Sequence, residues 1–392
     1  MPAQNAPPAG GGPTAPAPPW AELSGTQRAI VLALLRHGRL SRPQIMSLVG
    51  ISPGSVTRLT APLVEQGLLA TRPERASGAG RPPSPLELRA DAETLVGASL
   101  TARTLTVVLT DLRLDVLETA RRPLPGHDPR RVADLLADVV GELLARRRGA
   151  ATPSCLGISL GGTSRDGRTV DEAVFLGWHG VPLAATAEAC TGLPTRVGND
   201  LTALTRHEAW FGAGRDHGRF SLVTVGAGVG YGLVVDGGVI TSPDAELGLL
   251  GAIPVPDGAR PPVASPAMDC LTDTALERAW AKAGGEPLGA RAIVERAADG
   301  DRAAVAVCAS FARRLGRLIG MLAAFALPEV VVVAGERAAI ASLFEEQVMV
   351  GIAAVRRASA QSPTIVVREH ERVDWARGAA CLALEARVMG GL

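Results

Sequence analysis

The sequence predicts a small helical domain followed by a larger α/β domain, with a low-complexity arm in front. Residues 1–20 consist mostly of Pro, Gly and Ala, which bury too little surface to offset chain entropy, so this arm is expected to be disordered. Residues 21–90 contain short apolar patterns at helical spacing. Residues 91–392 alternate short apolar runs with longer amphipathic segments, which is typical of an α/β protein.

Composition excludes several classes of protein. Hydrophobic residues make up 47% of the chain and charged residues 20%, which favours a globular protein over a fibrous one. No uninterrupted apolar run reaches about 18 residues and no basic-then-apolar leader is present, so we expect a cytoplasmic protein without membrane contact. The 5 cysteines form no C-x-x-C pair, which argues against a disulfide framework or a zinc ribbon.

The small domain is predicted to hold three helices and a β-hairpin. The first helix ends near Gly38, and Ser41 and Ser52 are the expected N-caps of the second and third helices. Strands are predicted at 68–71 and 86–88. The segment between them, RPERASGAGRPPSP, is too rich in Gly, Pro and Arg to be buried, so it is expected to form an exposed wing.

The third helix and the wing have the features of a DNA-binding surface. Residues 1–90 contain nine Arg against four Glu, with no Lys or Asp, although a solvated basic face explains this excess equally well. The outer face of the third helix is small and polar, as a helix in the major groove requires, and the stiff GRPP segment suits a narrow minor groove. The predicted DNA contacts are Ser52, Gly54, Ser55, Thr57 and Arg58 in the helix, and Arg72, Arg75, Gly80, Arg81 and Pro82 in the wing.

Several motifs together resemble a known family. QRAIVLALLRHGRLSRPQI is followed by GRPP, and the larger domain holds GW-x-x-VPL at 177–183, LP-x-x-VGND at 193–200, GAGVGYGLVVDG at 226–237 and GAA at 378–380. Over about residues 25–390 the chain resembles the ROK family (repressors, open reading frames and sugar kinases), and specifically its repressor branch with an N-terminal winged helix-turn-helix.

The resemblance implies an actin-like sugar-kinase fold, in which two ribonuclease-H-like α/β lobes enclose a cleft. Lobe one is expected at about 91–198 plus 373–392, and lobe two at about 199–372. In family kinases an Asp after an Asn is the general base, and Asn199 and Asp200 match that pair, with Asp200 as a vestigial position. Capping of the helix that follows explains Asp200 equally well. The ligand-binding residues that the resemblance implies are Trp178, Asn199, Asp200, Gly226, Gly228 and Glu246.

Several motifs that family kinases use to bind phosphate and zinc are altered in this sequence. The phosphate motif D-x-G-x-T maps to Ser99, Thr101 and Arg103, which removes the carboxylate associated with the metal. Ala227 stands where the kinases usually carry a threonine, and a plain strand turn explains the surrounding glycine run as well as a phosphate site does. The zinc module is reduced to Cys270, and zinc needs four ligands. We therefore expect no bound metal, no cofactor and no catalysis.

Three functions remain open at this level. The leading one is a repressor that binds an inverted repeat of double-stranded operator DNA as a homodimer or homotetramer, with a second domain that senses a sugar or sugar phosphate. The enzyme alternative is a sugar kinase with an accessory DNA-binding domain, motivated by Asp200 and the glycine run. The third is a DNA-binding regulator without a ligand, which follows from the depleted sugar contacts.

Overall fold

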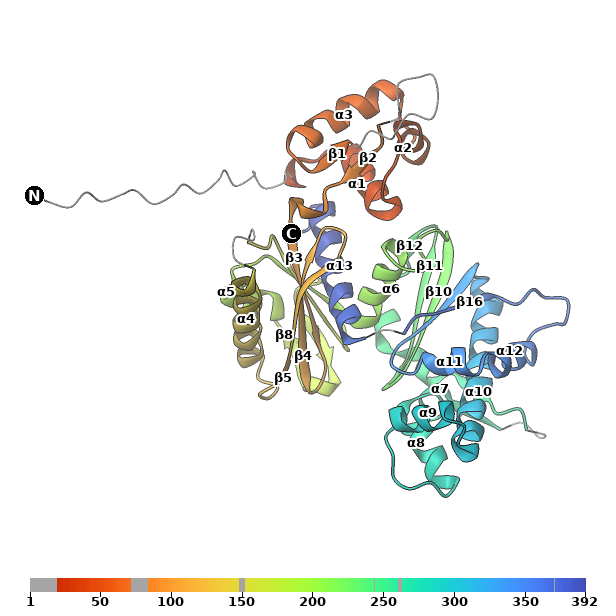
Figure 1. Cartoon of the computed structure of the whole chain (residues 1–392). Helices are drawn as coiled ribbons and strands as arrows, with labels where there is room; N and C mark the ends of the chain where they lie inside the picture. The colour runs from red at the N-terminus through yellow and green to blue at the C-terminus, as the bar shows by residue number, and fades with distance from the viewer. Residues whose placement is uncertain (1–19, 72–83, 148–151, 243, 260–262, 370) are drawn as a thin grey trace, which may run out of the picture.

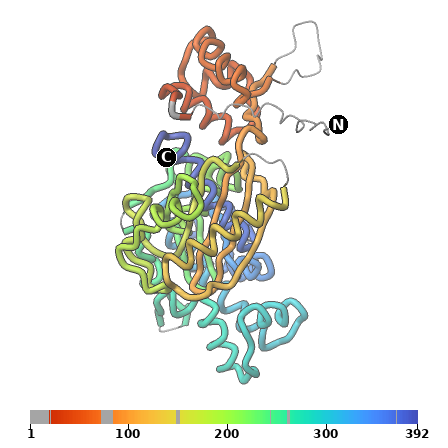
Figure 2. Tube along the Cα trace, turned by 90° about the vertical axis from the view of Figure 1, so that its left-hand side faces the viewer, coloured from red at the N-terminus to blue at the C-terminus, as the bar shows by residue number. Residues whose placement is uncertain are grey.

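The computed structural model describes residues 20–71, 84–147, 152–242, 244–259, 263–369 and 371–392. Residues 20–71 and 84–89 form a head that sits on a body of two α/β lobes (Figure 1). The view turned by 90° shows the head at one end of the molecule and the helices around residues 273–298 at the other (Figure 2). In the described part of the chain, no helix is long and apolar enough to cross a membrane.

The head consists of three helices and a two-stranded antiparallel sheet. Ser41 and Ser52 are the N-caps of α2 and α3, as predicted, and Ser41 forms a capping box with Gln44. Gly50 ends α2 in the left-handed region, at φ 71°. The elements are η1 (Trp20–Glu22), α1 (Gly25–His37), α2 (Arg42–Val49), α3 (Pro53–Glu65), β1 (Leu69–Thr71) and β2 (Leu86–Leu88).

Lobe one is a five-stranded sheet in the order β5-β4-β3-β6-β9, with an antiparallel meander and two parallel strands. Helices α4 and α5 cover one face and α13 covers the other (Figure 1). The elements are η2 (Ala90–Ala92), β3 (Thr94–Leu100), β4 (Thr104–Asp111), β5 (Val116–Pro123), α4 (Pro129–Arg146), β6 (Leu156–Leu160), β7 (Val170–Ala173), η3 (Val174–Leu176), β8 (Trp178–Val181), α5 (Leu183–Thr191), β9 (Thr195–Asn199) and α13 (Arg372–Met389).

Lobe two repeats this topology, with the strand order β12-β11-β10-β15-β16. Its sheet packs against α6 on the side of lobe one and against a helical layer built around α10 (Figure 1). The elements are α6 (Asp200–Trp210), β10 (Arg219–Val225), β11 (Val229–Val235), β12 (Gly238–Val239), η4 (Ala245–Leu247), η5 (Leu249–Ala252), β13 (Pro254–Pro256), β14 (Ala264–Pro266), α7 (Ala267–Cys270), α8 (Asp273–Lys282), α9 (Ala290–Ala298), α10 (Arg302–Ala326), β15 (Val330–Ala334), α11 (Ala339–Leu343), α12 (Glu345–Ala353) and β16 (Thr364–Val367).

Helices α6 and α13 pack against each other between the two sheets (Figure 1). Glycines make the close approach of α13 possible. A Cβ on Gly97 or Gly157 would collide with backbone carbonyls of α13, and a Cβ on Gly378 would lie 3.0 Å from the backbone of Ala203 in α6. The small residues of the GAA motif therefore let one helix touch the lobe-one sheet and the neighbouring helix at the same time.

Candidate DNA-binding surface and ligand cleft

Helix α3 presents a small, polar face to solvent. Ser52, Gly54, Thr57 and Arg58 are exposed and Ser55 is half-buried, whereas the apolar residues of the helix face the head core. A Cβ added to Gly54 would meet nothing within 4 Å, so a duplex can come close to the backbone there. This surface meets the steric requirement for a helix that enters the major groove.

The predicted wing contacts cannot be placed in the same way. Arg72, Arg75, Gly80, Arg81 and Pro82 lie outside the described residues, and their contact with DNA stays a prediction. Where the chain returns, Nη1 of Arg42 at the start of α2 donates to the carbonyl of Ser84 at 3.2 Å. The end of the wing is therefore held beside α2.

The carboxyl ends of β6 and β9 lie where the resemblance predicts the lobe-one side of the cleft. Asn199 is the N-cap of α6: its Oδ1 accepts from the N–H of Thr202 at 3.0 Å, and its Nδ2 donates to the carbonyl of Gly162 at 2.9 Å. The alternative in which Asp200 caps this helix is therefore wrong, because the preceding residue already fills that position. Both polar groups of Asn199 are engaged within the protein.

Asp200 is the first residue of α6, and its side chain is largely but not completely buried. Its Oδ1 accepts from the N–H of Leu201 at 2.8 Å, and a Cβ on Gly161 would lie 3.6 Å from its Oδ2. Burial raises the pKa of Asp200 from 3.8 to about 6; its own N–H and that of Leu201 oppose the rise, and the charge of Glu336 adds to it.

Glu246 joins the two lobes. It lies in η4 of lobe two, and its Oε2 accepts from the N–H of Ser164, which follows β6 in lobe one, at 3.0 Å. Burial raises the pKa of Glu246, the Ser164 N–H opposes this, and the charges of Asp171 and Asp200 raise it further. A ligand that enters the cleft would have to accommodate or replace this contact between the lobes.

The glycine turn, residues 226–228, follows β10. The N–H of Gly226 donates to the carbonyl of Gly228 at 3.1 Å, and the carbonyl of Gly226 accepts from the N–H of Asp273 at 2.8 Å. A side chain on Gly226 would collide with Oε2 of Glu336, so that carboxylate lies directly against the turn. The N–H of Gly226 is therefore already hydrogen-bonded within the protein.

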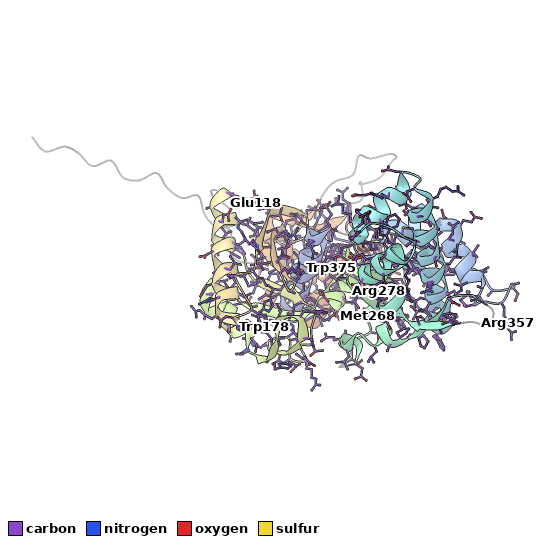
Figure 3. All side chains as sticks on the ribbon, turned by 90° about the horizontal axis from the view of Figure 1, so that it is seen from below. Glu118, Trp178, Met268, Arg278, Arg357 and Trp375 are labelled. Carbon is purple, nitrogen blue, oxygen red and sulfur yellow. The ribbon has the colours of Figure 1, made fainter. Side chains whose placement is uncertain are left out.

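Trp178 lies in the core of lobe one. Its side chain is only 3% exposed, and its Nε1 donates to the carbonyl of His127 at 2.5 Å. Seen from below, it lies on the lobe-one side, away from Met268 and Arg278 of lobe two (Figure 3). In this conformation Trp178 contributes packing, and its role as a ligand contact stays a prediction.

Two parts of the cleft escaped the sequence reasoning: the loop from Gly161 to Ser164 and Glu336. A Cβ on Gly162 would collide with the carbonyl of Glu172, so the loop passes close to β7. Adjacent glycines after a predicted strand were an available signal for a close approach. Glu336 gave no comparable local signal.

Among the described residues, no group of three His, Cys, Asp or Glu is placed to hold a metal ion.

Two family models match the chain. The model of the ROK family matches residues 96–386, and the model of a winged helix-turn-helix DNA-binding domain matches residues 23–70. The chain belongs to the ROK family. The predicted class, a winged helix-turn-helix followed by two α/β lobes of the actin-like kinase type, is confirmed.

Relatives of this ROK protein include transcriptional regulators and repressors. A transcriptional regulator of Mycobacterium tuberculosis is 29% identical over 337 residues, which cover 81% of this chain and 76% of the relative. The DNA-binding transcriptional dual regulator of Escherichia coli K12 and the N-acetylglucosamine repressors of two other strains are 26% identical over 324 residues, 79% of each chain. A crystal structure of a ROK family transcriptional regulator, a homologue of the E. coli MLC protein, superimposes with a TM-score of 0.74 at 22% identity over 93% of this chain and 96% of that one. The ROK protein is a transcriptional regulator that binds DNA through its winged helix-turn-helix.

Proposed function

We propose that this ROK protein is a cytoplasmic repressor that binds an inverted repeat of operator DNA as a homodimer or homotetramer, and that a sugar bound between its lobes changes its affinity for DNA. The observation that carries the proposal is a shared core between head and body. Ile30 and Leu34 of α1 belong to the same buried cluster as Leu204 of α6 and Val388 of α13. A change in the body therefore has a packed route to the DNA-binding surface.

Three polar contacts fix the head to the ends of both central helices. Nη1 of Arg28 donates to the carbonyl of Val388 at the end of α13. Nε of Arg215, just after α6, donates to the carbonyl of Arg36 at the end of α1. The Arg36 guanidinium also lies 5.5 Å from the centre of the Trp210 ring, the last residue of α6. The head thus rests on α6 and α13 together.

Helices α6 and α13 connect the cleft with the joint, by which we mean the contacts of Arg28, Arg36 and Arg215 between head and body. Helix α6 starts at Asp200 in the cleft and ends under the head, a length of roughly 16 Å for its 11 residues. It packs on the lobe-two sheet, whereas α13 packs on the lobe-one sheet. A ligand that prefers one angle between the lobes would shift the two contact points relative to each other, and with them the two heads of a dimer.

The family and the carboxylates of the predicted cleft support a sugar as the ligand. Some relatives carry N-acetylglucosamine in their names, and the cleft keeps the carboxylates of Asp200 and Glu246, which accept hydrogen bonds from sugar hydroxyls. Ser99, Thr101 and Arg103 replace the kinase phosphate motif, which supports a regulator without phosphoryl transfer. A coupled assay for ADP release over a panel of monosaccharides should show no turnover. Sustained turnover that is lost in Asp200→Asn would make the protein a kinase.

DNA binding is tested by fluorescence anisotropy with labelled duplexes from upstream of the protein's own gene. The wild type should bind at low ionic strength and lose affinity steeply with added salt. Arg58→Ala should weaken binding by about 1–3 kcal/mol, or roughly 5- to 150-fold. Arg291→Ala is the matched control, because Arg291 is an exposed arginine on α9 at the far end of the body (Figure 1).

The two steps of the proposal fail separately. Wild-type protein that ignores these duplexes at low ionic strength would remove operator binding. Equal affinity of Arg58→Ala and Arg291→Ala would remove Arg58 from the contact surface only. Addition of N-acetylglucosamine, glucose or another monosaccharide should change the affinity of the wild type for DNA, and a flat response across the panel would remove the effector.

A further inference from the structure

The glycine turn of the cleft is already occupied by a carboxylate of the protein itself. Glu336 follows β15, which pairs in parallel with β10, and Ala334 is the register partner of Thr224. The glycine turn and Glu336 therefore leave the same edge of one sheet. The chain turns at Gly335 with φ 89°, where a Cβ would come within 2.6 Å of the carbonyl of Val225. Sheet register and this turn hold the Glu336 carboxylate against Gly226.

The polar groups around Glu336 do not offer a ready phosphate site. The N–H of Gly226 is bonded within the turn. The neighbouring cation Arg337 donates Nε and Nη2 to the two carboxylate oxygens of Asp273, at 2.7 and 3.3 Å. Nη2 of Arg372 lies 4.0 Å from Oε1 of Glu336, so the positive charge of this half-exposed arginine is paired with that carboxylate. A phosphate at the turn would therefore lie against the negative charge of Glu336.

Two further carboxylates add to the negative charge of the cleft. The charge of Glu336 contributes to the raised pKa of Asp200, and the charge of Asp200 contributes to the raised pKa of Glu246. Asp200 therefore lies within electrostatic range of both glutamates. A phosphate ester carries about −1.5 to −2 charges at neutral pH and offers mainly acceptors. The hydroxyls of an unmodified sugar donate to carboxylates. The carboxylates of the cleft thus favour an unmodified sugar over its phosphate ester.

We propose that the cleft binds an uncharged sugar and that Glu336 excludes phosphorylated sugars and nucleotides from it. The first half rests on the proposed function, in which the cleft is the effector site; the exclusion by Glu336 does not. Under this assignment the regulator responds to a free sugar before a kinase modifies it, rather than to the phosphorylated product.

The test is isothermal titration calorimetry on the full chain with four probes: N-acetylglucosamine, N-acetylglucosamine 6-phosphate, glucose 6-phosphate and ADP. Glu336→Gln removes the charge with little change in shape, and Glu346→Gln is the matched control, because Glu346 is exposed in the first turn of α12. Removal of a like charge about 5 Å from a phosphate should tighten ADP and sugar-phosphate binding by about 10- to 100-fold. The affinity for N-acetylglucosamine should stay within about twofold.

Each outcome decides one claim. Glu336→Gln protein that binds ADP and the sugar phosphates no better than Glu346→Gln overturns the exclusion by Glu336. Wild-type protein that binds N-acetylglucosamine 6-phosphate more tightly than N-acetylglucosamine overturns the uncharged ligand. ADP binding gained in Glu336→Gln, while no sugar in the wider monosaccharide panel binds or alters DNA affinity, upholds the exclusion and removes the sugar effector of the proposed function. Unchanged DNA affinity of both variants shows that they are folded.

Discussion

Replacement of Asp200 by Asn should stabilise the protein in a pH-dependent way. The Asp200 carboxyl is largely buried, accepts one hydrogen bond from the N–H of Leu201, and lies within electrostatic range of the negative charge of Glu336. These surroundings favour its protonated form and raise its pKa to about 6, from 3.8. Asparagine has the shape of the protonated acid and keeps an oxygen for the Leu201 N–H, so it removes the charge and leaves the contact.

The sign and size follow from proton linkage. Because the folded-state pKa is raised, the unfolded chain releases the proton first, and stability falls as the pH rises from about 4 through 6. The loss is complete above pH 6. A rise in pKa from 3.8 to about 6, at about 1.4 kcal/mol per pKa unit, corresponds to about 3 kcal/mol. Asp200→Asn avoids this loss, so its advantage should be about 1.6 kcal/mol at pH 5 and about 3 kcal/mol at pH 8.

Thermal and urea unfolding at pH 5, 6.5 and 8, followed by tryptophan fluorescence, measure this difference. Asp138→Asn is the control, because Asp138 is exposed on α4. Asp200→Asn should melt several degrees above the wild type at pH 8, and the gap should narrow at pH 5. An advantage that is equal at pH 5 and pH 8 would show that Asp200 does not titrate in this range, and the argument from burial would be refuted.

Three other variants test the joint and the cores. The double variant Arg28→Ala/Arg215→Ala removes two of the side-chain contacts between head and body. Operator DNA should still bind in anisotropy, but the response of DNA affinity to a sugar should be weakened. An undiminished response would show that these two contacts do not transmit the signal. Gly378→Ala places a Cβ 3.0 Å from the backbone of α6 and should cost about 1–3 kcal/mol in urea unfolding, whereas a neutral effect would mean that the helices separate freely. Leu34→Ala opens the fully packed head core and should cost about 2–5 kcal/mol, measured in the same way, with little loss expected for the exposed Leu48→Ala.

Features confined to a few consecutive residues were predictable from the sequence. Ser41 and Ser52 cap helices because their hydroxyls bond backbone groups three residues later, which requires no knowledge of the rest of the chain. The outer face of α3 follows from helical periodicity in the same way. The alternation of short apolar runs and amphipathic segments in residues 91–392 was enough to predict the α/β class, but not the order of the strands.

Features that depend on strand order could not be predicted. Asn199 and Asp200 are both good N-caps, and the choice between them depends on where β9 ends beside β6. Glu336 reaches the glycine turn because β15 lies next to β10, more than a hundred residues away in sequence. Trp178 was recognised through its motif, but a motif does not show that the ring is buried. The wing residues lie outside the described part of the chain, so their contacts with DNA remain predictions.

The position of α13 has a consequence for synthesis of the protein. Ribosomes deliver every strand of the lobe-one sheet before they deliver this helix, so one apolar face of the sheet stays uncovered until residues 372–389 emerge. The docking partner of Arg28 at Val388 is made 360 residues after Arg28 itself. A nonsense or frameshift mutation between residues 90 and 372 would therefore spare the DNA-binding head, yet remove α13, one of the two helices on which the head packs, and leave a chain prone to aggregation.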